Sequence, residues 1–127
     1  MRILGNGIDL VSISRIRAIL DQGSDHFERR VFSAGERAYC RERKDPMPHF
    51  AARFAAKEAY AKALGLGLGP SGEFAEIEVA NEDNGRPVIR LSGKALEISR
   101  AHGVSECHLS ISHEGDQAIA SVILVGT

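Results

Sequence analysis

The stretch from His49 to Leu64, HFAARFAAKEAYAKAL, constrains the fold more than any other part of the chain. Alanine is the strongest helix former and fills seven of these sixteen positions, which predicts one strong helix. Gly65 follows directly and is the residue type that most often ends a helix. Because alanine projects so little, the charged side chains Arg53, Lys57 and Glu58 stand out on a helix that is otherwise apolar and that we expect to be half-buried.

Glu58 and Lys62 lie one helical turn apart, with the glutamate on the N-terminal side, where such a pair is favoured. One interpretation is a solvated salt bridge, which contributes well under ~1 kcal/mol to stability. The other is a carboxylate and an ammonium group that bind a metal ion and the phosphate that the metal also holds. The pair alone does not separate these two interpretations.

A second carboxylate favours the metal site. Asp9 stands inside an apolar run at the N-terminus, where strand interiors are depleted in aspartate and an unpaired buried carboxylate is costly. Ser12 and Ser14 are better placed than Asp9 to cap the following helix. We therefore expect Asp9 to share a hard cation with another carboxylate, since magnesium commonly takes one or two protein carboxylates, waters and substrate phosphates.

Periodicity and turn signals predict one α+β domain over residues 1–127, in which a mainly antiparallel sheet packs with the long central helix. Ser33 and Glu36 form a capping box, and Asn84-Gly85 is a hairpin signal. The predicted strands cover 2–11, 74–81, 87–91, 105–112 and 117–125, and the other helices cover 12–20, 33–43 and 93–102.

Composition excludes several classes of function. The formal charge of −1, the five Phe, two Tyr and no Trp, and the lack of a basic stripe argue against a nucleic-acid binder. Cys40 and Cys107 have no ligand-like spacing, which argues against zinc, and two lone cysteines suit a reducing cytosol. No signal sequence and no run of 18 apolar residues occur, so we expect a soluble cytoplasmic protein that does not bind membranes.

Two segments carry a family resemblance. GIDLV at 7–11 and RFAAKEAYAKALG at 53–65 resemble the two signature motifs of the holo-acyl-carrier-protein synthases, the small members of the 4′-phosphopantetheinyl transferase superfamily. Four further segments match in the same order: the Gly-rich loop 65–72, FAEIEV at 74–79, NGRP at 84–87 and SISH at 110–113. Six matches in order across the whole chain make the resemblance specific.

The resemblance implies that the phosphopantetheine arm of coenzyme A moves to a serine hydroxyl of an apo acyl carrier protein, with release of adenosine 3′,5′-bisphosphate. It also implies that Asp9 and Glu58 bind Mg²⁺, or Mn²⁺ in its place, and that Lys62 steadies the leaving phosphate as a point charge. Either Glu58 or a metal-bound water would take the proton of the serine.

Seven positions match residues that contact coenzyme A in the family. Four of them also have a simpler interpretation: Lys44 in a solvated helix end, Gly65 as a helix cap, Pro87 in a hairpin and His113 in a surface turn. The implied coenzyme A ligands are Lys44, Lys62, Gly65, Arg86, Pro87, Ser112 and His113.

The first helix, with Arg15 and Ile19, is implied to dock the carrier protein, although Asp21, Asp25 and Glu28 dilute its positive charge. Val11 stands where the larger relatives have a third acidic ligand, so a water would complete the metal shell. The resemblance to the small, single-copy members of the superfamily implies a homotrimer with sites between subunits. The alternatives are a non-catalytic module that binds coenzyme A or a nucleotide diphosphate, and a structural trimer domain.

Overall fold

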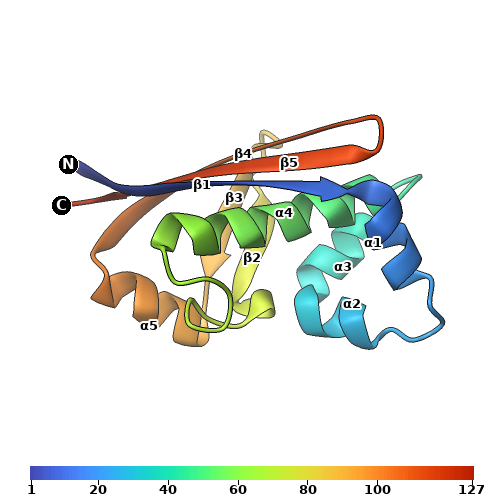
Figure 1. The fold of residues 1–127 in the computed structure, drawn as a ribbon, viewed down its shortest axis with the longest axis horizontal. Coiled ribbons are helices and arrows are strands. Elements are labelled where there is room, and N and C mark those ends of the chain that lie inside the picture. Colours follow the sequence, from blue (N-terminus) through green and yellow to red (C-terminus); the bar gives the residue numbers. More distant parts are fainter.

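The computed structural model describes residues 1–127, and its five α-helices all lie on one side of a three-stranded sheet (Figure 1). The sheet is antiparallel in the order β1-β5-β4, and β2 and β3 form a separate antiparallel hairpin. None of the helices combines the length and the apolar composition needed to cross a membrane. The elements are β1 (Arg2–Ser12), α1 (Ile13–Leu20), α2 (His26–Val31), α3 (Ala34–Arg41), α4 (Met47–Leu64), a 3-10 turn η1 (Phe74–Glu76), β2 (Ile77–Asn81), β3 (Pro87–Leu91), α5 (Gly93–Ala101), β4 (Val104–Glu114) and β5 (Gln117–Gly126).

Helix α4 packs directly against the backbone of β1. A Cβ atom on Gly5 or Gly7 would lie only 2.0 Å from the carbonyl oxygen of Ala63 or Ala59, respectively, so only glycine fits at these two positions. The inward side chains of β5 cover the same helix and are fully buried: Ala118, Ala120, Val122 and Leu124. Because side chains two residues apart on a strand share a face, this contact also turns Asp9 toward α4.

Local signals placed most of the elements correctly. The capping box of Ser33 and Glu36 is confirmed, and Gly65 ends α4 in the left-handed conformation at φ 82°. Helix α4 starts at Met47, two residues earlier than predicted, because Pro48 is accommodated in its first turn, where its missing N–H is not needed. Helix α3 ends at Arg41, before the predicted residue 43, and α2 was not predicted.

Two predictions about the strands need correction. The strand expected from residue 74 starts at Ile77, because the Glu76 carboxylate accepts hydrogen bonds from the backbone of Glu73, Lys94 and Ala95 and holds a turn there. The sheet is also divided into two, since β2 and β3 pair only with each other. Both parts are antiparallel, so the α+β class is unchanged.

A buried ion pair sets which face of α4 points toward α3 and β2. Lys57 Nζ lies 2.8 Å from Glu36 Oε1 and also donates to the carbonyl oxygens of Phe74 and Ile77 at 2.8 and 2.6 Å. Glu36 Oε2 accepts from Val79 N at 2.8 Å, and both charged side chains are fully buried. Burial lowers the pKa of Lys57, while the Glu36 carboxylate opposes that change. With its three donor hydrogens paired, Lys57 ties α4 to α3 and β2.

Candidate functional site

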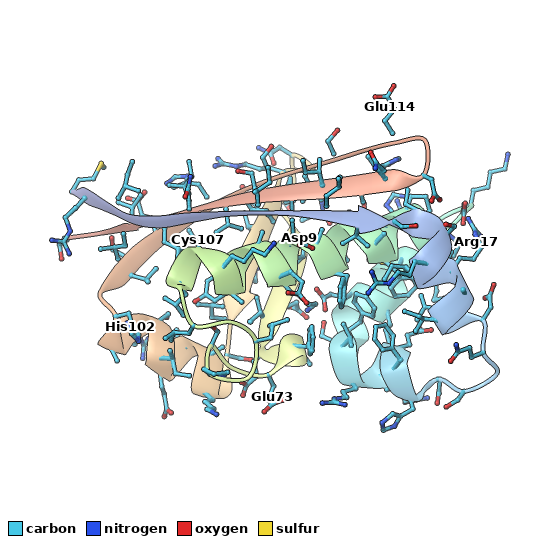
Figure 2. All side chains as sticks on the ribbon, viewed as in Figure 1. Asp9, Arg17, Glu73, His102, Cys107 and Glu114 are labelled. Carbon is cyan, nitrogen blue, oxygen red and sulfur yellow. The ribbon has the colours of Figure 1, made fainter.

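Asp9 and Lys62 meet where β1 runs alongside α4. Figure 2 shows Asp9 at this junction, and its side chain is only 17% exposed. Lys62 Nζ donates to Asp9 Oδ1 at 3.0 Å and to the carbonyl oxygen of Ile8 at 3.1 Å. The expected pair between Glu58 and Lys62 is wrong as a contact, because Lys62 reaches the edge of β1 and forms its salt bridge with Asp9.

Glu58 faces the same junction from the previous turn of α4. Burial raises the pKa of the Glu58 carboxyl, and the nearby negative charge of Asp9 raises it further, while Lys62 opposes both effects. Two carboxylates that repel each other beside a single ammonium group form a site that gains from a second positive charge. The sequence prediction that Asp9 and Glu58 lie together therefore agrees with the geometry.

A cleft of about 400 Å³ opens beside these residues, and we call it the carboxylate cleft. Its charged lining comes from Asp9, Arg15, Glu58 and Lys62, so the docking residue predicted on α1 shares a cavity with the predicted metal ligands. The rest of the lining is apolar and comprises Leu10, Val11, Ile16, Ile19, Phe27 and Phe54. A charged end and an apolar wall suit a ligand that carries phosphates on an aliphatic arm.

The donor set of the carboxylate cleft fits a magnesium ion. Asp9 and Glu58 offer hard carboxylate oxygens, and Val11 on the same wall offers none. No group of three or more His, Cys, Asp or Glu side chains capable of holding a metal occurs in the chain. Two carboxylates match an ion that keeps several waters and binds substrate phosphates, rather than one held in a full protein cage.

A second cleft of about 240 Å³ lies between α3, α4, the β2–β3 hairpin and the end of β4. We call it the arginine cleft, because its floor includes Arg53, which is only 2% exposed. The lining residues are Tyr39, His49, Ala52, Arg53, Asn81, Gly85, Pro87, Ile111, Ser112 and His113. It shares no residue with the carboxylate cleft.

Arg53 is a buried cation without a carboxylate partner. Its Nη2 donates to Asn81 Oδ1 at 2.8 Å, and its guanidinium lies 4.1 Å from the ring centroid of Tyr39. Its Nε is buried and has no hydrogen-bond partner. An unpaired buried charge is costly, whereas Lys57 on the same helix is fully paired. Arg53 is therefore poised for an anion that enters the cleft.

Most of the predicted site residues fall into one of the two clefts. Asp9, Arg15, Ile19, Glu58 and Lys62 line the carboxylate cleft. Pro87, Ser112 and His113 line the arginine cleft, and Lys44, Gly65 and Arg86 line neither. Sequence reasoning missed Arg53 as a site residue, although an arginine in an alanine-rich buried helix was the signal that pointed to it.

Helix α1 presents one free cation to the carboxylate cleft. Ser12, one of the two serines predicted to cap the helix, does so by accepting from Arg15 N. Arg15 forms no salt bridge, whereas Arg17, on the other flank of α1, is held by Asp45 at 2.8 Å. Asp25 likewise pairs with Arg29. Asp45 and Asp25 are thus engaged by other arginines and leave Arg15 without a salt bridge.

Comparisons with known proteins show what the whole chain is similar to. Residues 5–122 match the 4′-phosphopantetheinyl transferase superfamily. The holo-[acyl-carrier-protein] synthase of Syntrophus aciditrophicus is 49% identical over 122 residues, which cover 96% of this chain and 95% of that protein. The crystal structure of holo-[acyl-carrier-protein] synthase from Neisseria meningitidis has a TM-score of 0.88 at 33% identity and covers 98% of this chain and 99% of that one. The Helicobacter pylori synthase in complex with coenzyme A has a TM-score of 0.84 at 32% identity, covering 94% and 99% of the two chains.

Proposed function

The chain belongs to the 4′-phosphopantetheinyl transferase superfamily, and we propose how its two clefts serve that activity. It transfers 4′-phosphopantetheine to apo acyl carrier protein, in keeping with its superfamily and with relatives that are named holo-[acyl-carrier-protein] synthases. We propose that coenzyme A is the donor, since the Helicobacter pylori synthase binds it, and that a serine hydroxyl of the carrier is the acceptor. One observation is the main support for this function: Asp9, Glu58 and Lys62 lie together on the wall of the carboxylate cleft.

In the proposed reaction the serine oxygen attacks the phosphorus linked to pantetheine. The bond from that phosphorus to the bridging oxygen breaks, its electron pair stays on that oxygen, and adenosine 3′,5′-bisphosphate leaves. Lys62 neutralises charge that develops on the leaving phosphate. Its ammonium group is in position to do so, because it lies on the wall of the carboxylate cleft beside Asp9. Glu58 accepts the serine proton, directly or through a water.

Asp9 and Glu58 are the residues that would hold Mg²⁺, and Mn²⁺ accepts the same oxygen donors. When bound there, the ion supplies positive charge to both phosphates of coenzyme A. Burial and, after it, repulsion from Asp9 raise the pKa of Glu58. A cation held by both carboxylates would relieve that repulsion, which supports this assignment.

Coenzyme A is proposed to occupy both kinds of cleft, with one cleft supplied by each of two neighbouring copies of the chain. The carboxylate cleft takes the diphosphate and the arm, and the arginine cleft takes the adenosine 3′-phosphate at Arg53, His113 and Pro87. The two clefts share no residue, and Lys44 and Arg86 are exposed outside both. We propose that Lys44, Gly65 and Arg86 meet coenzyme A only at the border between subunits.

A homotrimer would also cover the bare face of the sheet. All the helices lie on one side of β1, β5 and β4, and large apolar side chains on these strands remain exposed: Ile3, Ile8, Leu10 and Ile123. Replacing Ile8 by lysine is expected to weaken this contact, because it would bury a charge at the interface. Sedimentation velocity should give three times the single-chain mass for the unmodified protein and smaller species for Ile8→Lys. A monomer in the unmodified protein would contradict the trimer.

The carrier protein is proposed to dock on α1 beside the carboxylate cleft, with Arg15 as the charged contact and Ile19 as the apolar one. Arg15→Glu is expected to raise the KM for apo carrier about tenfold, which corresponds to ~1.4 kcal/mol, and to leave coenzyme A affinity unchanged. Arg17→Glu is the matched control, since it makes the same charge change on the flank where Asp45 already neutralises the arginine. Equal loss of carrier and coenzyme A affinity in Arg15→Glu would contradict this division.

The function is tested by incubating the purified protein with coenzyme A, Mg²⁺ and an apo acyl carrier protein and measuring the intact mass of the carrier. A mass gain equal to phosphopantetheine that EDTA abolishes would support the transferase and its metal together. Tight binding of coenzyme A with no mass gain on any carrier would instead support a binding module.

We place the reaction in the cytoplasm. Cys40 and Cys107 are both unpaired, and burial raises the pKa of each thiol to about 12. Unpaired thiols are usual in proteins of a reducing compartment.

A further inference from the structure

The arginine cleft contains a histidine that the reaction described above does not use. His49 lies in the first turns of α4, one helical turn before Arg53, so the two side chains share a face of the helix. The centroid of its ring lies 5.9 Å from the ring centroid of Tyr39 and 6.1 Å from that of His113, and both contacts are edge to face. His49 therefore sits between the wall formed by α3 and the wall formed by β4.

The charged groups around His49 are mostly cations. Arg53 on its own helix, His113 on β4 and Arg43 after α3 all disfavour a proton on the imidazole. Asp45, before α4, acts in the opposite direction, but its carboxylate is engaged with Arg17. Burial is the largest of these effects, and together they lower the pKa of His49. The empty cleft thus holds His49 as a neutral ring at neutral pH.

We propose that His49 is a proton-linked ligand for the 3′-phosphate of coenzyme A, and that it takes up a proton from solvent when this phosphate monoester enters the arginine cleft. The inference rests on the proposed function, because it assumes that this cleft receives the adenosine 3′-phosphate. A dianion beside Arg53 reverses the local electrostatic potential, favours the imidazolium form and gains a charge-assisted hydrogen bond from it. His49 would then help to distinguish coenzyme A from its 3′-dephosphorylated form.

The sign of the pH dependence follows from this linkage. The pKa of His49 is lower in the empty cleft than in the occupied one, so affinity for the 3′-phosphate falls as pH rises through the higher value. A phosphate monoester also titrates near pH 6, which acts on the ligand itself. The experiment must therefore separate a proton taken up by the protein from one already carried by the ligand.

Isothermal titration calorimetry of the purified protein makes this separation, with adenosine 3′,5′-bisphosphate and AMP as ligands in buffers of different ionisation heat. AMP keeps the adenosine and the 5′-phosphate and lacks only the 3′-phosphate. For the unmodified protein we expect uptake of roughly half a proton or more per bisphosphate near pH 7, and about tenfold tighter binding at pH 6 than at pH 8. AMP should show neither effect beyond its own titration.

His49→Gln should remove the proton uptake and keep the bisphosphate affinity at pH 8.5 within about twofold, because the neutral ring contributes little there. Equal uptake in His49→Gln would overturn the assignment, as would pH-independent binding by the unmodified protein. NMR titration of the histidine ring protons, with and without bisphosphate, tests the same point without a substitution, and an unshifted His49 would also overturn it. Failure of both coenzyme A and bisphosphate to bind at any pH would instead overturn the proposed function.

Discussion

Replacing Glu58 by glutamine is expected to lower kcat for phosphopantetheine transfer by about 10²–10⁴-fold. The amide keeps the size of the side chain but removes both its negative charge and its ability to accept the proton of the serine. Glu58 is the carboxylate whose pKa is raised by burial and by Asp9, so its loss leaves Asp9 alone with Lys62. Steady-state kinetics with an apo carrier and Mg²⁺ measure the change.

The matched control for Glu58→Gln is Glu97→Gln, which makes the same chemical change on an exposed face of α5. This control should retain full activity and the same thermal stability. A Glu58→Gln protein that still modifies the carrier at the original rate would keep the reaction and remove Glu58 from the site.

Replacing Lys57 by methionine is expected to lower the free energy of unfolding by about 3–5 kcal/mol. Methionine fills a similar volume, but it leaves the buried Glu36 carboxylate without its cation and the carbonyl oxygens of Phe74 and Ile77 without their donor. Urea unfolding followed by circular dichroism measures the loss.

Two comparisons make the Lys57 prediction specific. Lys94→Met, on the exposed surface of α5, should change stability by less than about 0.5 kcal/mol. The double variant Lys57→Met with Glu36→Gln should recover part of the loss, because the neutral amide no longer leaves a buried charge unpaired. A single Lys57→Met variant as stable as the original protein would show that the ion pair does not hold α4 in place.

Local chemistry made much of the fold predictable. Alanine content and Gly65 defined α4, the Ser33–Glu36 box started α3, and Asn84-Gly85 marked the turn between β2 and β3. Each signal acts within a few residues, so no knowledge of distant packing was needed. The α2 helix was missed because it is only six residues long and has no side-chain cap at its start.

The carboxylate pair was also accessible from the sequence, because an aspartate in an apolar strand and a glutamate on an apolar helix are each anomalous where they stand. The salt-bridge partner of Lys62 could not be predicted from the sequence. Helical spacing favoured Glu58, but Gly5 and Gly7 let β1 approach α4 so closely that Lys62 reaches Asp9. A long-range contact of this kind leaves no mark in the spacing of the residues involved.

The sequence by itself determined most of the helices, the hairpin turn between β2 and β3, the family and the two carboxylates as candidates, since these depend on local propensity and on motifs kept in order. Only the tertiary structure decided that Arg53 is buried without a carboxylate partner and that His49 and His113 face each other. His49 and His113 lie 64 positions apart in the chain and meet because β4 returns beside the start of α4. The charge state of such a cluster depends on burial and on neighbours from distant elements, and those are set by packing.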